Sequence, residues 1–211
     1  MATYKNGISG AFSGKLGPVV GSSFRGLNVM RAKPRKTTKK PTAAQLEQRA
    51  RFAAVNYFLS PANSILSQYF GEPEGNKSRC HLATSHHLHN AVHWDGTKAH
   101  ILYQKALFAK GDLLGFKNLI GIALPATQLQ LTWENSTEGN ALATDELMVL
   151  AIAPSFDCYE LFSEVSTRST GSATLSLPPF LSGNHVHCWA FAVSAEGRLN
   201  STSVYLGNFV L

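Results

Sequence analysis

The chain has 211 residues, of which 44% are hydrophobic, with a mean hydropathy of −0.06 and a formal net charge of +6. This length suits one large domain or a small domain with an extension, and no apolar run approaches the ~20 residues that a membrane-spanning helix needs. The three cysteines lie far apart without a CxxC pair, which argues against a disulfide framework or a zinc ribbon.

Basic residues are concentrated near the start of the chain. Residues 1–51 contain eleven Lys or Arg and one acid, Glu47, whereas residues 52–211 contain eight basic and twelve acidic residues. We therefore expect a basic arm attached to a mildly acidic body. Such an arm usually contacts something negatively charged: nucleic acid, a membrane surface or an acidic face of another subunit.

Glycine recurs in residues 1–41 at intervals of three and four positions. A free helix would lose roughly 1 kcal/mol for each glycine, and both phosphate-loop and dinucleotide fingerprints fail, since Leu16 follows Gly14-Lys15 and no acid precedes Glu47. Apolar residues stand between the glycines, so we expect an irregular, extended arm that lies in a groove or adds a strand to a neighbouring sheet. Packing on its own body and a solvated tail remain open alternatives.

Two sets of arm residues are predicted to make contacts. The expected subunit contacts are Gly7, Gly10, Phe12, Gly14, Gly17, Val19, Val20, Gly21, Phe24 and Gly26. The candidate contacts to an anion or nucleic acid are Arg31, Lys33, Arg35, Lys36, Lys39 and Lys40. Binding by the second set would be salt-dependent and sequence-independent, and without an aromatic residue between Phe24 and Phe52 it would not stack on bases.

Three helices are expected in residues 42–95. Thr42 and Gln45 form a capping-box pattern at the start of the first helix. This helix is expected to run to about residue 59, because Pro61 interrupts the helical pattern there. The second and third helices are expected at about 62–70 and 76–90. An apolar face of the first helix is predicted from Leu46, Ala50, Ala53, Ala54, Tyr57 and Phe58.

Short strands separated by turn signals follow in residues 96–211. The candidates are HILYQKALFA, QLQLTW, ELMVLAIA, CYELFSEV, SATLSL, HVHCWAFAVS and TSVYLGNFVL, of which ELMVLAIA is apolar throughout and is expected to be central. This spacing is typical of a β-sandwich. The predicted fold class is therefore α+β, with an arm over 1–41, a helical segment over 42–95 and a sandwich over 96–211.

Several stretches resemble known proteins. NGISGAFSGKLGPVVGSSFRG, the following basic stretch and PTAAQLEQRARFAAVNYFL resemble an uncharacterised bacterial family of unknown function over nearly the full chain. The glycine-rich start and the QxxxRxxF helix are also similar to phage-type virion or tail components, a likeness that implies an assembling role by analogy. The carboxy-terminal part, with Trp133 at the end of an early strand, is similar to fibronectin type III and immunoglobulin-like modules.

Neither a metal site nor a catalytic site is expected. His86, His89 and His93 would share one face of a long helix, and Cys80 or Asp95 could complete a zinc shell, but a polar helix face is the simpler interpretation. His185 and His187 share a strand face. Asp157, Cys158 and Glu160 stand close in sequence, yet no nucleophile has a base placed by spacing, so we expect no cofactor and no enzyme activity.

We therefore expect a non-enzymatic structural protein whose arm contacts the next subunit head to tail, giving a homo-oligomeric filament, tube or ring. The alternatives are a nucleic-acid-binding protein that uses the basic arm and a carbohydrate- or surface-binding module that uses the sandwich loops. The first residues lack the charged-then-apolar layout of a signal peptide. We expect synthesis in the cytoplasm, with release into an extracellular or virion-like assembly left open.

Overall fold

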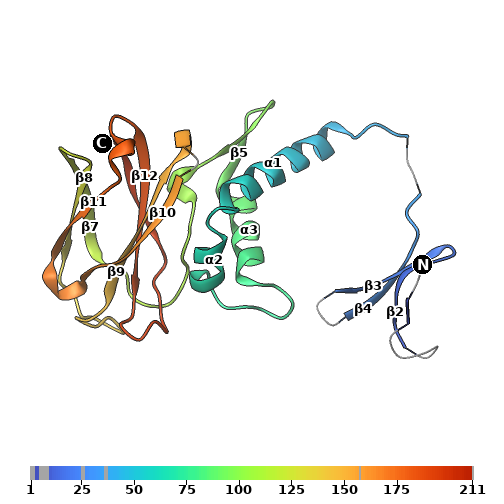
Figure 1. Ribbon diagram of the computed structural model, residues 1–211, viewed down its shortest axis with the longest axis horizontal. Helices are drawn as coiled ribbons and strands as arrows, with labels where there is room; N and C mark the ends of the chain where they lie inside the picture. The colour runs from blue at the N-terminus through green and yellow to red at the C-terminus, as the bar shows by residue number, and fades with distance from the viewer. Residues whose placement is uncertain (1–2, 5–9, 25–26, 36–37, 157, 211) are drawn as a thin grey trace. The chain divides into compact units, whose positions relative to one another are not determined.

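The computed structural model describes residues 3–4, 10–24, 27–35, 38–156 and 158–210 (Figure 1). Its contacts divide the chain into two compact units, Met1–Thr42 and Ala43–Leu211. We call the first the N-terminal unit and the second the body.

The N-terminal unit is an antiparallel sheet in the order β1-β2-β3-β4, formed by Thr3–Tyr4, Phe12–Leu16, Val19–Phe24 and Leu27–Ala32. This differs from the irregular, extended arm that the sequence predicted. Gly17 explains the difference: its φ of +57° lets Gly17 and Pro18 form a two-residue turn between the paired residues Leu16 and Val19. The described arm therefore pairs with itself.

The body contains a sandwich of two antiparallel sheets, as the sequence predicted. The three-stranded sheet has the order β11-β8-β7, formed by Ser172–Ser176, Gln128–Glu134 and Lys117–Leu124. The four-stranded sheet has the order β10-β9-β12-β13, formed by Cys158–Thr167, Glu146–Ala153, His185–Val193 and Val204–Val210. Seven strands in two sheets with alternating inward residues is the architecture of immunoglobulin-like sandwiches.

The two central strands of the four-stranded sheet are buried on both faces, because helices cover the side away from the other sheet (Figure 1). On β9, Leu147 and Val149 pack between the sheets, whereas Met148 and Leu150 pack toward the helices. Since alternate residues meet two different cores, the strand is apolar throughout. The central position predicted for ELMVLAIA is thus confirmed.

The helices α1, α2 and α3 span Ala43–Leu59, Asn63–Tyr69 and Arg79–Asn90. Ser78 caps α3 by accepting a hydrogen bond from the His81 amide, so this helix begins later than predicted. In α1 the buried residues are Val55, Phe58 and Leu59. Of the predicted apolar face, Phe58 is thus buried, Ala50 and Ala54 are half-buried, and the other three residues, Ala53 among them, are exposed. Leu46 and Tyr57 are exposed.

The segment expected as the strand HILYQKALFA is mostly irregular. Its first two residues, His100 and Ile101, belong to β6 (Ala99–Ile101), which forms a small hairpin with β5 (Val92–Trp94). The 3-10 turn η2 (Tyr103–Lys105) follows within the segment. After η2, backbone amides donate to side chains instead of to a neighbouring strand. The Ser203 hydroxyl accepts from Phe108 N–H at 3.0 Å, and the His87 ring accepts from Leu107 N–H at 3.2 Å. Short 3-10 turns η3 (Pro154–Phe156), η4 (Arg168–Thr170) and η5 (Pro179–Leu181) lie in the sandwich loops.

The helical segment and the sandwich share one hydrophobic core, in which Phe58 and Phe108 pack with Trp189 and Phe191. Trp189 faces the helices and donates its indole N–H to Ala106 O at 3.0 Å. The predicted boundary after residue 41 lies one residue before the division between the two units, which falls after Thr42. The predicted boundary between residues 95 and 96 falls inside the body, which is a single compact unit.

Candidate functional site

Gly21 is the position in the N-terminal sheet where the need for glycine is clearest. A Cβ atom there would lie 2.8 Å from ring atoms of Phe12 and closer still to the Phe12 carbonyl oxygen. The aromatic ring therefore covers the Gly21 backbone, and the close approach excludes any side chain. This contact joins β2 to β3 within one chain.

The strand register defines two faces of this sheet. Gly14 pairs with Gly21, and Gly21 pairs with Met30. Paired residues share a face and alternate along each strand. One face, which we call the uncharged face, therefore consists of Phe12, Gly14, Leu16, Val19, Gly21, Ser23, Asn28, Met30 and Ala32.

The opposite face carries positive charge. Lys15 pairs with Val20, and Val20 pairs with Arg31, so two cations flank a valine across three strands. This basic face consists of Ser13, Lys15, Val20, Ser22, Phe24, Leu27, Val29 and Arg31. Apolar side chains are exposed on both faces: Met30 and Leu16 on the uncharged face are 67% and 47% exposed, and Phe24 on the basic face is 59% exposed.

The predicted subunit contacts thus fall mostly within this sheet. Gly10 lies just before β2, and Gly17 lies in the turn between β2 and β3. On the uncharged face lie Phe12, Gly14, Val19 and Gly21, and on the basic face lie Val20 and Phe24. Gly7 and Gly26 lie outside the described residues.

The predicted anion contacts begin on the last strand and continue beyond it. Arg31 lies on β4, and the amide of Lys33 donates to Pro18 O at 2.7 Å. Lys36 lies outside the described residues, and the others are exposed: Arg31, Lys33, Arg35, Lys39 and Lys40. The N-terminal unit contains nine basic and no acidic residues, against ten basic and thirteen acidic residues in the body.

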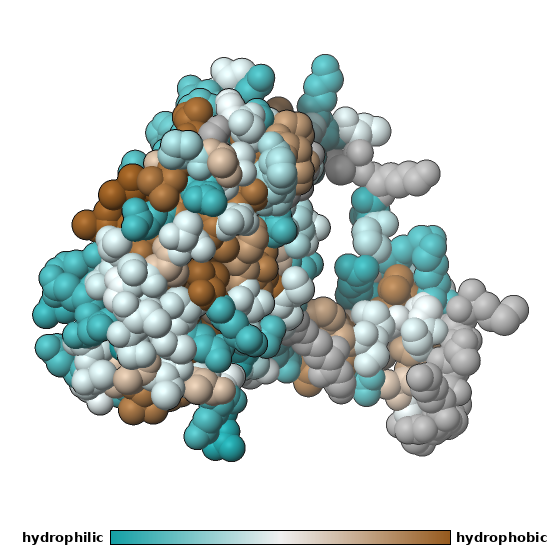
Figure 2. Space-filling view, turned by 60° about the vertical axis from the view of Figure 1, so that its left-hand side comes forward, coloured by the Kyte–Doolittle hydropathy of each residue, from teal (hydrophilic) through white to brown (hydrophobic). Residues whose placement is uncertain are grey.

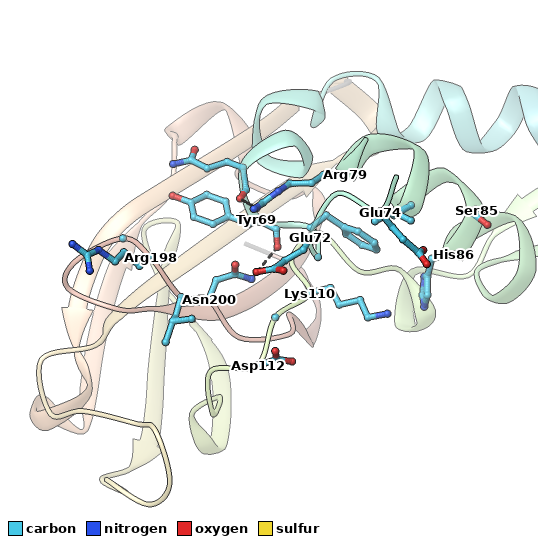
Figure 3. A pocket seen from close by; sticks show the side chains of 17 residues that line it. Tyr69, Glu72, Glu74, Arg79, Ser85, His86, Lys110, Asp112, Arg198 and Asn200 are labelled. Atoms are coloured by element: carbon cyan, nitrogen blue, oxygen red, sulfur yellow. Dashed lines mark hydrogen bonds between the residues drawn. The ribbon is translucent and has the colours of Figure 1, made fainter. Parts of the chain in front are cut away.

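The body has a polar cleft of about 560 Å³ that the sequence analysis missed (Figure 3). Segments far apart in the chain meet there, because Lys110 N–H donates to Tyr69 O at 2.9 Å and the Asn200 side chain donates to the same oxygen at 2.9 Å. Gly111 lies under the Asn200 carbonyl, where a Cβ would clash. These contacts fix the floor of the cleft.

Charged side chains of both signs line this cleft in equal number: Arg79, Lys110, Arg198, Glu72, Glu74 and Asp112. Burial lowers the pKa of His86 in its wall, and the nearby charges of Lys110 and His89 lower it further. The cleft therefore offers hydrogen bonds and a neutral imidazole, but no net charge that would select an anion or a cation.

The histidines considered as zinc ligands are not brought together. His86 and His89 lie on α3, which ends at Asn90, whereas His93 lies on β5. Across the described parts of the chain, no three His, Cys, Asp or Glu residues are placed to hold a metal ion. The neighbouring His87 is a core residue, since its Nδ1–H donates to Ala83 O at 2.8 Å and burial lowers its pKa to about 4.

The residues considered for catalysis lie on or near β10. Asp157 lies outside the described residues, Cys158 begins the strand opposite Ala153, and Glu160 pairs with Ala151. A further cysteine, Cys188, is buried, which raises the pKa of its thiol to about 12. Such a thiol is inert as a nucleophile at neutral pH.

A buried ion pair was also missed by the sequence analysis. The Arg168 guanidinium lies 3.2 Å from the Asp145 carboxylate, and both side chains are almost fully buried. Arg168 also donates to the carbonyls of Leu114 and Gly115 at 2.6 and 3.0 Å. Its own carbonyl accepts from the Trp133 indole at 2.8 Å, so the pair ties the sandwich loops together.

Within the described residues, no helix has the length and apolar character required to cross a membrane. No curated protein matches this chain.

Among solved structures, the chain is similar to the fn3 domain of human collagen alpha-1(XX) chain. The match has 15% sequence identity and a TM-score of 0.34, and it covers 46% of this chain and 83% of that domain. The sandwich assignment therefore rests on the strand order and the shared core of this protein itself. A family model matches residues 11–207, which is most of the chain: the protein belongs to a family of unknown function, DUF6266.

Proposed function

We propose that this protein is a non-enzymatic structural protein that self-assembles into a filament, tube or ring through its N-terminal unit. The observation that carries the proposal is a single-layer sheet with large apolar side chains exposed on both faces. In the described residues of that unit, no second layer covers the sheet. Sheets and helices bury an apolar face against another layer, and exposed apolar patches mark interaction sites.

Charge supports another copy of the chain as the partner. The N-terminal unit is strongly basic, whereas the body has more acidic than basic residues. Complementary charges raise the rate and specificity of association. Figure 2 shows hydrophobic side chains of the N-terminal unit at the surface beside hydrophilic ones.

Sedimentation velocity of the full chain and of residues 43–211 tests this proposal. The fragment contains both hydrophobic cores, so it should fold and sediment as a monomer. The full chain should form multi-subunit species at moderate salt. Monomers in both samples would overturn the proposal, and association of both would place the contact in the body.

A second candidate function is sequence-independent binding of nucleic acid. It is favoured by the exposed cations that continue from the basic face, Arg31, Lys33 and Arg35. Each phosphate contact would release counterions, so the affinity should fall steeply as salt rises.

Fluorescence anisotropy with two duplexes of unrelated sequence tests this second candidate. We expect both duplexes to bind equally at low salt and to dissociate at moderate salt. A variant with Arg31, Lys33 and Arg35 replaced by Gln should not bind either duplex. Absence of binding at low salt, or a strong preference for one duplex, would contradict it.

A further inference from the structure

The two faces of the N-terminal sheet suit different partners. Each N-terminal unit carries nine basic residues and no acid, so two copies repel one another wherever their cations meet. Lys15 and Arg31 both lie on the basic face. The uncharged face has no ionisable side chain among its nine positions, so two copies can approach through it without bringing like charges together.

We propose that the uncharged face of the N-terminal sheet packs against the same face of a second copy. This inference rests on the proposed function and names the partner surface of that assembly. Two sheets packed face to face about 10 Å apart bury their inner side chains between them. Leu16, Val19 and Met30 of both copies would then form the small core that a single sheet lacks.

The shape of the uncharged face suits this arrangement. A hollow of about 100 Å³ lies next to the Phe12 ring that covers Gly21, and its other lining residues are Gly10, Ala11, Asn28, Val29 and Met30. Met30 is the most exposed large apolar residue of the face and has the flexibility to fill an irregular gap. In an isologous pair the same contact occurs twice, with Met30 of each copy entering the hollow of the other.

This packing leaves the basic face outward. An isologous pair closes at two copies, so a filament or ring needs a second contact. The basic face supplies one, since its cations can meet the acidic body of a further copy. The uncharged face spans only about 14 Å by 17 Å, from strand spacing and rise. Because standard interfaces bury ~800 Å² on each partner, we expect the pairing to be reversible and concentration-dependent.

Two variants of the full chain separate the faces. M30K places an ammonium on the uncharged face, in the middle of the edge strand β4, and L27K places the same group on the same strand but on the basic face, away from the hollow. Both native side chains are exposed, at 67% and 55%, so neither change removes a buried core residue. Sedimentation velocity over a wide range of protein concentration measures association of each variant and of the unmodified chain.

M30K should weaken association at least tenfold, because it brings an unpaired charge into the contact. L27K should associate like the unmodified chain, because it adds a cation to a face that is already basic. Suppose that the unmodified chain associates. If both variants then lose association equally, or if both keep it, the pairing of uncharged faces is wrong, although the proposed assembly stands. If the unmodified chain stays monomeric at every concentration, the proposed function fails together with this inference.

Discussion

At the scale of single residues, His87 shows how a histidine-rich stretch can serve the core. The sequence HHLHN suggested a polar helix face, and that interpretation suits the exposed His89. His87, two positions earlier, is fully buried, with both ring nitrogens hydrogen-bonded, to Ala83 O and to the Leu107 amide. The sequence could not distinguish His87 from His89, because the amide that donates to the His87 ring belongs to Leu107, which lies in an irregular segment 20 positions further along the chain.

The buried His87 should make stability depend on pH. Its pKa falls from an ordinary value of 6.5 to about 4 in the folded chain, so the unfolded chain binds the proton more readily. Stability is therefore full above pH 6.5 and is lost as pH falls toward 4, by roughly 3 kcal/mol from this group. Urea unfolding at neutral and acidic pH measures this loss.

The H87Q variant should show a weaker pH dependence than the unmodified chain, although it is less stable at neutral pH. H89Q changes an exposed histidine of the same helix and is the matched control; it should keep the original pH dependence. Equal slopes in the unmodified chain and H87Q would contradict the assigned role.

Arg168 and Asp145 illustrate a residue pair that spacing does not reveal. They lie 23 positions apart and meet only because β10 returns beside β9. A lone buried charge would be costly, and the ion pair with its backbone hydrogen bonds offsets that cost. In sequence, Arg168 looks like an ordinary turn residue in STRST.

At the scale of elements, the strands of the body were largely predictable. ELMVLAIA and HVHCWAFAVS are nearly continuous apolar runs that match β9 and β12 within one residue. The strand β7 was missed, because its exposed Ile120 and Ile122 and the glycine between them break the expected alternation of apolar and polar residues. The glycine-rich hairpin β2–β3 was missed because few of its residues favour strands.

The hairpin β2–β3 should depend on the contact between Gly21 and Phe12. G21A forces a methyl group against the Phe12 ring and carbonyl, which should destabilise the N-terminal sheet by roughly 1–3 kcal/mol. Hydrogen exchange measured by mass spectrometry should then show faster exchange of the β2 and β3 amides.

S22A changes the next residue, whose side chain is exposed on the basic face, and should leave this exchange as in the unmodified chain. Exchange in the body should be unchanged in both variants. Unaltered protection of β2 and β3 in G21A would show that the close approach does not support the sheet.

At the scale of the whole molecule, the charge asymmetry was visible in the sequence, whereas the layered body was not. The helices were expected as a separate segment, but Phe58 and Trp189 join them to the sandwich in one core. The two-sided burial of β9 is the consequence of that third layer. The two units thus differ in kind: the body buries its apolar residues, and the N-terminal unit exposes many of them.

This contrast is the basis of the central claim that the N-terminal unit joins subunits. Negative-stain electron microscopy of the full chain beside residues 43–211, both at moderate salt, tests it most directly. The account predicts filaments, tubes or rings from the full chain and small single particles from the fragment. Small single particles in both samples would contradict it.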